Sequence, residues 1–480
     1  MTENNALKTK VLHSLKWVAL GRATTQTLRW ILTFWVIRIL TPEDYGIVAI
    51  ADILFSLLMT IASTIAISPL IQARNLEQKA ISSYFGITLC IYSLLFCGQY
   101  LLADTIANLY NNAFVADVLK VNAWCFLLLA LETVPTALLR RAMAFKKLAL
   151  ISAVSNIVAA ISTLLLAIYG YGFWALVYGE IIAIALRVAM VLIYHPAPCL
   201  PTFRIKDSLP LIRFGGLMSV FTLIWYVFIH LDVTIGGLLL TTAEIGIFTV
   251  ALNFALMPQK KILPLIKEIS FPAFSQLQDQ PEKITHFIVK AQRLGLIFTL
   301  PIFWGLASVC DYLLPSIIGV KWSAAILPTT LVLILMPLRF SEELFQPAAK
   351  ALGYIKYLII NTLYMAAFVS VALFALSKFG ATGLALAWLV GFPLAYAIVL
   401  YRYSKLFNFS MLIFLKSISK IMFCGVIMVA IVWSLKLYLT EVNVTNLLLL
   451  IAAGTLSYAL GLLLLERRTI RELQQAISSR

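Results

Sequence analysis

The stretch LTPEDYGIVAIA, residues 40–51, returns 200 positions later as LTTAEIGIFTVA, residues 240–251. Five of the twelve positions are identical, and Asp44 in the first copy corresponds to Glu244 in the second. One short repeat is compatible with chance. What it indicates about the fold depends on where the two copies lie in the topology of the chain.

The composition of the chain is that of an integral membrane protein. Of its 480 residues, 62% are hydrophobic and only 12% are charged, whereas soluble domains carry about 25% charged residues. The mean hydropathy is +0.96. The first apolar segment contains Arg22 and Arg29, which a cleavable signal sequence would not tolerate. We therefore expect this segment to remain in the protein.

Fourteen apolar segments are long enough to cross a bilayer as helices. They lie near residues 16–40, 45–70, 82–106, 115–139, 148–169, 173–194, 212–239, 244–271, 293–315, 323–349, 356–377, 381–401, 419–439 and 445–465.

The basic residues between these segments predict the orientation of the chain. With the N-terminus in the cytoplasm, the inner segments hold 25 Lys and Arg, and the outer segments hold four. Short loops rich in Lys and Arg stay inside, so both termini are predicted to be cytoplasmic. The net charge of +16 then belongs chiefly to the face that meets anionic membrane lipid, and it does not indicate a nucleic-acid partner.

Both copies of the opening repeat fall at outer hairpins, separated by six crossings. A second pair of segments, YGYGFWALVYG at 169–179 and FGATGLALAWLVG at 379–391, also occupies matching outer turns, although many glycine-rich membrane hairpins look alike. An even number of crossings gives both units the same topology, as in transporters built from parallel repeats. The repeated turn is therefore interpreted as a structural joint of a duplicated fold and not as a binding motif.

The predicted fold class is all-α and polytopic, with about 14 transmembrane helices. The predicted domains are a six-helix lobe at 1–195, a cytoplasmic amphipathic linker at 196–212, a second six-helix lobe at 213–405, and two extra helices with a cytoplasmic tail at 406–480.

Charged residues inside the spans are candidates for function because they are costly in a bilayer. Eight basic and seven acidic residues lie there, so structural ion pairing is the competing explanation. In the first span, Arg22, Gln26 and Arg29 share one helical face with Thr25 and Thr33. Arg29 lies roughly 20 Å from the inner end at 1.5 Å per residue, close to the midplane. A polar stripe at this depth needs water or protein beside it.

The eighth span carries a similar pattern. Asn253, Lys260 and Lys267 recur every seven residues, and Pro258 and Pro264 interrupt the helix. Proline frees backbone carbonyls, which need a wet or protein-lined neighbour at membrane depth. Arg and Lys from different halves of the chain, without a nucleophile or metal beside them, suit an anion such as phosphate or pyrophosphate.

Five further residues complete the candidate set. His230 and Asp232 could titrate together as a proton relay or form a hydrogen-bonded helix clamp. Glu342 and Glu343 are a second candidate for ion or proton coupling. Arg339 is a candidate for substrate binding, and it could instead be neutralised by Glu343.

Other chemistries lack a signal in the sequence. The six cysteines are scattered, without a CxxC pair or a histidine at metal-ligand spacing, so we predict buried thiols and no metal site. No phosphate-binding GxxxxGK[ST] loop is present, and no cofactor is predicted. The outer loops are short and hold only a lone acid or two, which disfavours a membrane enzyme. No catalytic residue is proposed.

Several segments in order resemble a known family. They are RWILTFWVIRILTPEDYGIVAIADIL, VPTALLRRAMAFKKLALI (134–151), GYGFWALVYGE (170–180), LDVTIGGLLLTTAEIGIFTVALNFALMP (231–258), ISFPAFSQLQ (269–278) and IIGVKW (317–322). Together they resemble the polysaccharide transporter family of lipid-linked oligosaccharide flippases, of the colanic acid and O-antigen exporter type. The likeness extends over about residues 10–410, and it lies in the ordered combination of segments.

The resemblance implies two six-helix lobes similar to those of multidrug and toxin extruders. It also implies that the chain flips an undecaprenyl-pyrophosphate-linked sugar repeat across the bacterial inner membrane, beside a polysaccharide polymerase and chain-length machinery. In the superfamily that contains these flippases and extruders, basic residues of the first and eighth spans line a cationic cavity. The resemblance implies that the matching positions here are Arg22, Arg29, Lys260 and Lys267. A small-molecule extruder of the same architecture, or a membrane glycosyltransferase or polymerase, remains the alternative.

Overall fold

The computed structural model describes residues 26–66, 78–142, 144–194, 202, 216–264, 266, 274 and 281–466. These ranges are predominantly helical and contain no strand. The chain divides into two compact units, Met1–Ser219 and Val220–Arg480. The predicted linker at 196–212 lies outside the described ranges except for Thr202.

The helices confirm an all-α membrane fold. Ten described segments are long and apolar enough to cross a membrane, and a pair bent by 43° at His230 brings the number to eleven. The difference from the fourteen predicted spans has simple causes. One counted segment, Ile355–Leu406, contains two helices, Thr242–Leu256 is a shorter apolar helix, and the first span is described only from residue 26.

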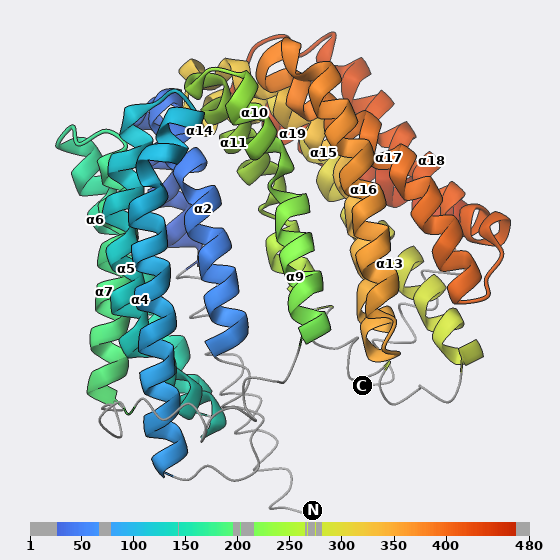
Figure 1. The fold of residues 1–480 in the computed structure, drawn as a ribbon. Coiled ribbons are helices and arrows are strands. Elements are labelled where there is room, and N and C mark those ends of the chain that lie inside the picture. Colours follow the sequence, from blue (N-terminus) through green and yellow to red (C-terminus); the bar gives the residue numbers. More distant parts are fainter. Residues whose placement is uncertain are drawn as a thin grey trace, which may run out of the picture. The chain divides into compact units, whose positions relative to one another are not determined.

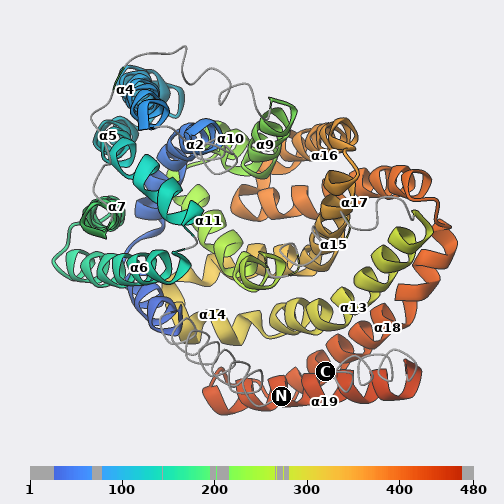
Figure 2. The same cartoon turned by 90° about the horizontal axis from the view of Figure 1, so that it is seen from below.

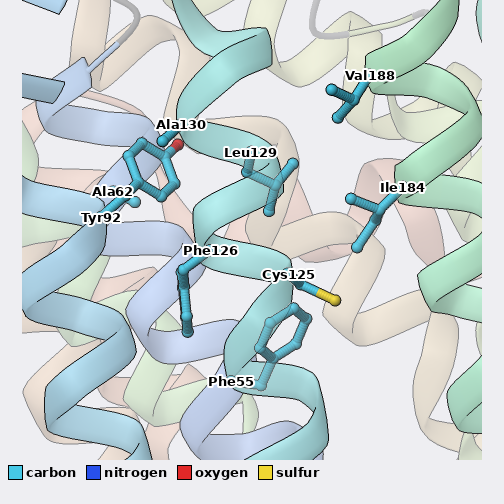
Figure 3. Packing of buried hydrophobic residues seen from close by; sticks show 9 residues of the cluster. All are labelled: Phe55, Ala62, Tyr92, Cys125, Phe126, Leu129, Ala130, Ile184 and Val188. Atoms are coloured by element: carbon cyan, nitrogen blue, oxygen red, sulfur yellow. The ribbon is translucent and has the colours of Figure 1, made fainter. Parts of the chain in front are cut away.

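The first unit is built around one central helix. It contains helical residues 26–39, α2 (Pro42–Ala66), α4 (Gln78–Leu109), α5 (Ala113–Arg141), α6 (Phe145–Ile168) and α7 (Trp174–Tyr194), which Figure 1 shows. Helix α5 packs against α2, α4, α6 and α7. Phe55 from α2, Tyr92 from α4, Phe126 from α5 and Ile184 from α7 belong to one buried apolar cluster (Figure 3).

The second unit contains the remaining helices. They are α9 (Gly216–Ile229, whose first turn precedes the unit boundary), α10 (Leu231–Leu239), α11 (Thr242–Leu256), α13 (Pro281–Ser308), α14 (Cys310–Ile318), η2 (Val320–Ala325), α15 (Ile326–Ala351), α16 (Ile355–Leu376), η3 (Ser377–Phe379), α17 (Gly380–Leu406), α18 (Met411–Lys436) and α19 (Val444–Leu465). Helix α13 lies between α15 and the α18–α19 pair, as Figure 2 shows. Helices α15 and α17 pack together and hold much of the buried core.

The repeated turn has the same structure in both units. In each copy a threonine hydroxyl caps the next helix by accepting from the backbone N–H of the acid three residues later, and the acid's carboxylate accepts from the backbone N–H of the threonine. The backbone N–H of Thr41 donates to Asp44 Oδ2 at 2.8 Å, and the N–H of Asp44 donates to the Thr41 hydroxyl at 3.2 Å. The corresponding distances for Thr241 and Glu244 are 3.0 Å and 3.3 Å.

The acid of each turn also lies against the glycine turn that forms the second repeat. Gly172 and Gly380 both have positive φ, +56° and +67°, a conformation that favours glycine. A Cβ at Gly172 would lie 3.1 Å from Asp44 Oδ1, and one at Gly380 would lie 2.5 Å from Glu244 Oε1. The two repeated segments therefore meet inside each unit, which explains why they recur together.

Of the five described cysteines, Cys90 and Cys97 are exposed and the other three are buried. The prediction of buried thiols is wrong for these two. Both lie on α4, whose exposed face also carries Leu94 and Leu101. The physical reason is that a free thiol behaves as a small apolar group, which a lipid-facing surface accommodates as well as a protein core does.

Candidate functional site

Arg29 lies on the helical segment 26–39 and opens onto a cavity of the first unit. The cavity has a volume of about 180 Å³, enough for several water molecules. Its polar lining consists of Arg29, Thr33, Tyr45, Asn156, Thr163 and Glu180, and its apolar lining consists of Val36, Ala159, Ala160, Leu176, Gly179 and Ala183. The predicted polar face of the first span therefore meets a cavity at Arg29 and Thr33.

Two other predicted residues of this stripe have different positions. Gln26 is half-buried on the same helical segment and is not part of the cavity lining. Arg22 lies outside the described residues.

The lining of this cavity also contains an acid, Glu180. Glu180 comes from α7, 151 positions from Arg29 in the sequence, and both side chains are exposed. Neither the guanidinium of Arg29 nor the carboxylate of Glu180 forms an ion pair or a side-chain hydrogen bond with any described residue. Opposite charges that line one cavity without pairing leave donors and acceptors open to water or to a ligand.

Another charged pair of the same unit is structural. Arg187 Nε of α7 lies 3.0 Å from the carboxylate of Glu132 on α5. Glu132 is nearly buried and Arg187 is about one third exposed. This pair satisfies two of the charges inside the spans without a ligand, as the ion-pairing explanation expects.

In the second unit, the predicted basic stripe is described at two positions. Lys260 Nζ donates to Asn253 Oδ1 at 3.1 Å, and both residues are exposed. The spacing of seven residues therefore does place the two on one face. Lys267 lies outside the described residues.

Asp232 is the most buried of the candidate acids, with 1% of its surface exposed. Its Oδ1 accepts from the backbone N–H of Val233 at 2.7 Å, and its Oδ2 accepts from Trp388 Nε1 at 3.0 Å. A buried carboxylate is costly without such donors. Asp232 therefore joins the first turn of α10 to the middle of α17.

His230 lies at the 43° bend between α9 and α10. Its ring packs against that of Tyr226 in a tilted arrangement, with centroids 4.3 Å apart. No hydrogen bond links His230 to Asp232 in the described part of the chain, although only one residue separates them. The direct His–Asp contact that a relay would use is thus absent from this conformation.

Arg339 also contacts Trp388. Its guanidinium sits 4.5 Å from the centre of the indole ring, a distance typical of cation–π contacts. The residue is 8% exposed and interacts electrostatically with Glu343, Asp232 and Glu342. Trp388 therefore contacts both a buried carboxylate and a buried guanidinium.

Glu342 and Glu343 have different surroundings. Glu342 is 2% exposed, accepts from Gln346 Nε2 at 3.1 Å, and lies 3.4 Å from the hydroxyl of Tyr403. Glu343 accepts from Gln259 Nε2 at 2.7 Å. The two adjacent carboxylates thus point to separate partners, one toward α17 and one toward the segment that follows α11.

Sequence reasoning missed Glu180, Trp388, Gln259 and Tyr403 as members of these sites. Trp388 and Tyr403 look like ordinary apolar or aromatic positions of a membrane helix, and nothing in their spacing shows which acid they meet. Glu180 and Gln259 carry a detectable signal, because a carboxylate or amide inside an apolar span needs a partner. Among the described residues, no group of three or more His, Cys, Asp or Glu could hold a metal ion.

The described helices are long and apolar enough to define a polytopic α-helical membrane protein. A family model described as "Polysaccharide biosynthesis protein" matches residues 36–327. The chain belongs to this polysaccharide biosynthesis protein family.

Two curated relatives carry names from surface-polysaccharide synthesis. The chain is 24% identical over 316 residues to the succinoglycan biosynthesis transport protein ExoT of Rhizobium meliloti, which covers 66% of this chain and 64% of ExoT. It is 22% identical over 330 residues to the lipopolysaccharide biosynthesis protein WzxC of Escherichia coli, which covers 67% of this chain and 66% of WzxC. The chain thus spans just under two thirds of the length of both relatives.

Solved structures show the same fold at low identity. The lipid II flippase MurJ in an inward closed conformation aligns with a TM-score of 0.75 and 17% identity, over 95% of this chain and 99% of MurJ. An inward-facing multidrug resistance transporter of the MATE family, in the MOP superfamily, aligns with a TM-score of 0.56 and 14% identity, over 80% and 94% of the two chains. The predicted fold class is therefore confirmed.

Proposed function

We propose that this protein is a flippase that moves an undecaprenyl-pyrophosphate-linked oligosaccharide repeat from the inner to the outer leaflet of the bacterial inner membrane. The product would serve the synthesis of a surface polysaccharide, either lipopolysaccharide O-antigen, exopolysaccharide or capsule. Membership of the polysaccharide biosynthesis family and the lipid II flippase fold support this proposal. The observation that carries it is Arg29, a guanidinium inside an apolar span that opens onto a polar cavity.

The substrate explains why a protein must provide such a path. Each unpartnered hydroxyl costs several kcal/mol in hydrocarbon, and a bare pyrophosphate costs far more. A hydrated groove with basic side chains replaces water around the head group, while the lipid tail stays in the bilayer. Arg29 and Lys260 are the described cations that we assign to the pyrophosphate, with Gln26 and Asn253 as polar neighbours. Arg22 and Lys267 complete the proposed set by their positions in the sequence. Arg339 is included because it is a buried cation beside Trp388 and near Glu342 and Glu343.

Transport would proceed by alternating access. The substrate enters from the cytoplasmic side, binds the cations, and is released when the protein opens to the other side. We place both termini in the cytoplasm because of the distribution of Lys and Arg. A polysaccharide polymerase and chain-length machinery would receive the product.

Coupling to an ion or proton gradient is assigned to the buried acids of the second unit. Asp232, Glu342 and Glu343 are carboxylates within the membrane, and His230 lies at a helix bend two positions before Asp232. Protonating Asp232 would weaken its bond to Trp388 Nε1 and its attraction to Arg339, so the state of this acid would alter contacts among α10, α15 and α17. Export that persists unchanged after the proton and sodium gradients are collapsed would refute this assignment.

The test of the function is complementation in a flippase-deficient strain that makes a known surface polysaccharide. Wild type is compared with Arg29→Ala and Arg29→Lys at matched membrane abundance. We expect Ala to abolish surface polymer, and partial rescue by Lys would indicate that charge matters more than bidentate geometry. Arg38→Ala is the matched control, because Arg38 lies on the same helical segment but outside the cavity lining.

Equal export by Arg29→Ala and wild type would refute the assignment of Arg29 to the pyrophosphate. A small-molecule exporter is the second candidate, favoured by the alignment with a multidrug transporter. Failure of the wild-type protein to restore any surface polymer, together with extrusion of small cations, would support that alternative.

A further inference from the structure

The cavity of the first unit contains a charged group that a pyrophosphate site does not require. Glu180 is a carboxylate on the same cavity as Arg29. A site for an anion alone would exclude a carboxylate, because like charges disfavour one another in a low-dielectric environment. A site for a cation alone would exclude Arg29 for the same reason.

The two groups make opposite demands on a ligand. A guanidinium can only donate hydrogen bonds, and an ionised carboxylate can only accept them. A ligand that satisfies both must offer acceptors and donors within a small volume. Hydroxyl groups do both, and a sugar residue carries several of them around one ring.

The threonines add acceptors to this lining. The hydroxyl of Thr33 donates to the carbonyl of Arg29 at 2.8 Å, and that of Thr163 donates to the carbonyl of Ala159 at 2.8 Å. Because each proton is used within its own helix, the oxygen presents lone pairs to a neighbour. Asn156 supplies both a donor and an acceptor.

The remaining lining fits the apolar face of a ring. Ala159 and Ala160 of α6 and Ala183 of α7 contribute small apolar side chains to this lining. Gly179 also matters, because a Cβ there would overlap the hydroxyl of Thr163. The glycine lets the Thr163 side chain occupy this position on the cavity wall.

We propose that this cavity is a sugar subsite, which binds the sugar residue next to the pyrophosphate through Arg29, Asn156 and Glu180. The proposal rests on the proposed function and deepens it, since it assigns recognition of the first sugar to the first unit. Glu180 accepts hydrogen bonds from ring hydroxyls. Arg29, which has five N–H donors, donates to a hydroxyl and to the adjoining phosphate.

The experiment measures how much a sugar adds to binding. The probes are water-soluble short-chain prenyl pyrophosphates, one without a sugar and three that carry glucose, galactose or N-acetylglucosamine. Binding to the purified full-length protein in detergent is measured by titration calorimetry for wild type, Glu180→Gln and the control Glu43→Gln. Glu43 is an exposed acid of α2 outside the cavity lining.

We expect at least one sugar to tighten wild-type binding by about tenfold over the sugar-free probe. Glu180→Gln keeps the shape of the side chain and should remove most of this gain, while the sugar-free probe binds within about twofold of wild type. Glu43→Gln should retain the full gain.

Three results would overturn the subsite. One is a wild type that binds all four probes equally, and another is a Glu180→Gln variant that keeps the whole sugar gain. In both cases binding of the sugar-free probe leaves the proposed function standing. A wild type that binds none of the probes would overturn the subsite and the pyrophosphate site together.

Discussion

The hydrogen bond between Trp388 and Asp232 leads us to predict how one substitution changes the stability of the second unit. Trp388→Phe removes the indole N–H that donates to Asp232 Oδ2 at 3.0 Å, but it keeps an aromatic ring beside Arg339. Both partners are about 1% exposed. Water therefore cannot replace the lost donor without a rearrangement of the helices.

The expected magnitude has two parts. A hydrogen bond to a charged group contributes about 1.5–3 kcal/mol, and trimming a buried indole to a phenyl ring costs further packing energy. We expect Trp388→Phe to lower the free energy of unfolding by about 2–4 kcal/mol. In a double-mutant cycle with Asp232→Ala, which cancels the packing part, the coupling energy should be about 1.5–3 kcal/mol.

The assay is equilibrium unfolding in mixed detergent micelles, followed by far-ultraviolet circular dichroism so that loss of a tryptophan does not alter the signal. Trp124→Phe is the control, because Trp124 is 57% exposed on α5, and its change should stay within about 0.5 kcal/mol. A coupling energy below about 0.5 kcal/mol would refute the reasoning, because it would mean that Asp232 loses no donor when the indole is removed.

Two further predictions concern helix packing. A Cβ at Gly391 would lie 2.9 Å from the carbonyl oxygen of Phe368 and 3.0 Å from the Cα of Val369, and backbone cannot swing aside. Gly391→Ala should therefore lower the free energy of unfolding by about 1–3 kcal/mol. The control is Gly98→Ala, whose added Cβ would meet nothing within 4 Å, and it should be neutral or stabilise the protein by up to about 1 kcal/mol. Equal unfolding free energies for the two variants would contradict this prediction. Glu132→Gln should cost about 2 kcal/mol, between the values for surface and buried ion pairs, because it leaves Arg187 without its partner. The double variant Glu132→Gln/Arg187→Met should recover part of that loss, and a double variant less stable than the single one would contradict the pairing.

Much of the fold could be predicted from the sequence because its causes are local. Apolar runs long enough for a bilayer specify spanning helices, and the distribution of Lys and Arg predicts their direction. The recurrence of LTPEDYGIVAIA as LTTAEIGIFTVA indicated two related units, and the structure shows why the acid persists. Asp44 and Glu244 each close a capping box with a threonine three residues earlier, an interaction within one turn of chain. Helical spacing likewise placed Arg29 and Thr33 on one face, and Asn253 and Lys260 on another.

The candidate sites depended on tertiary structure. Arg29 and Glu180 line one cavity although 151 positions separate them, and Asp232 and Trp388 meet across 156 positions. Helical periodicity relates only residues a few positions apart on one element. Which acid meets which base, and whether a charge is paired or left open to a ligand, is determined by the packing of distant helices. The sequence by itself therefore determined the membrane class, the repeated turn and the charged residues inside the spans. Only the tertiary structure decided that Glu132 pairs with Arg187 and that Glu180 pairs with no residue in the described part of the chain.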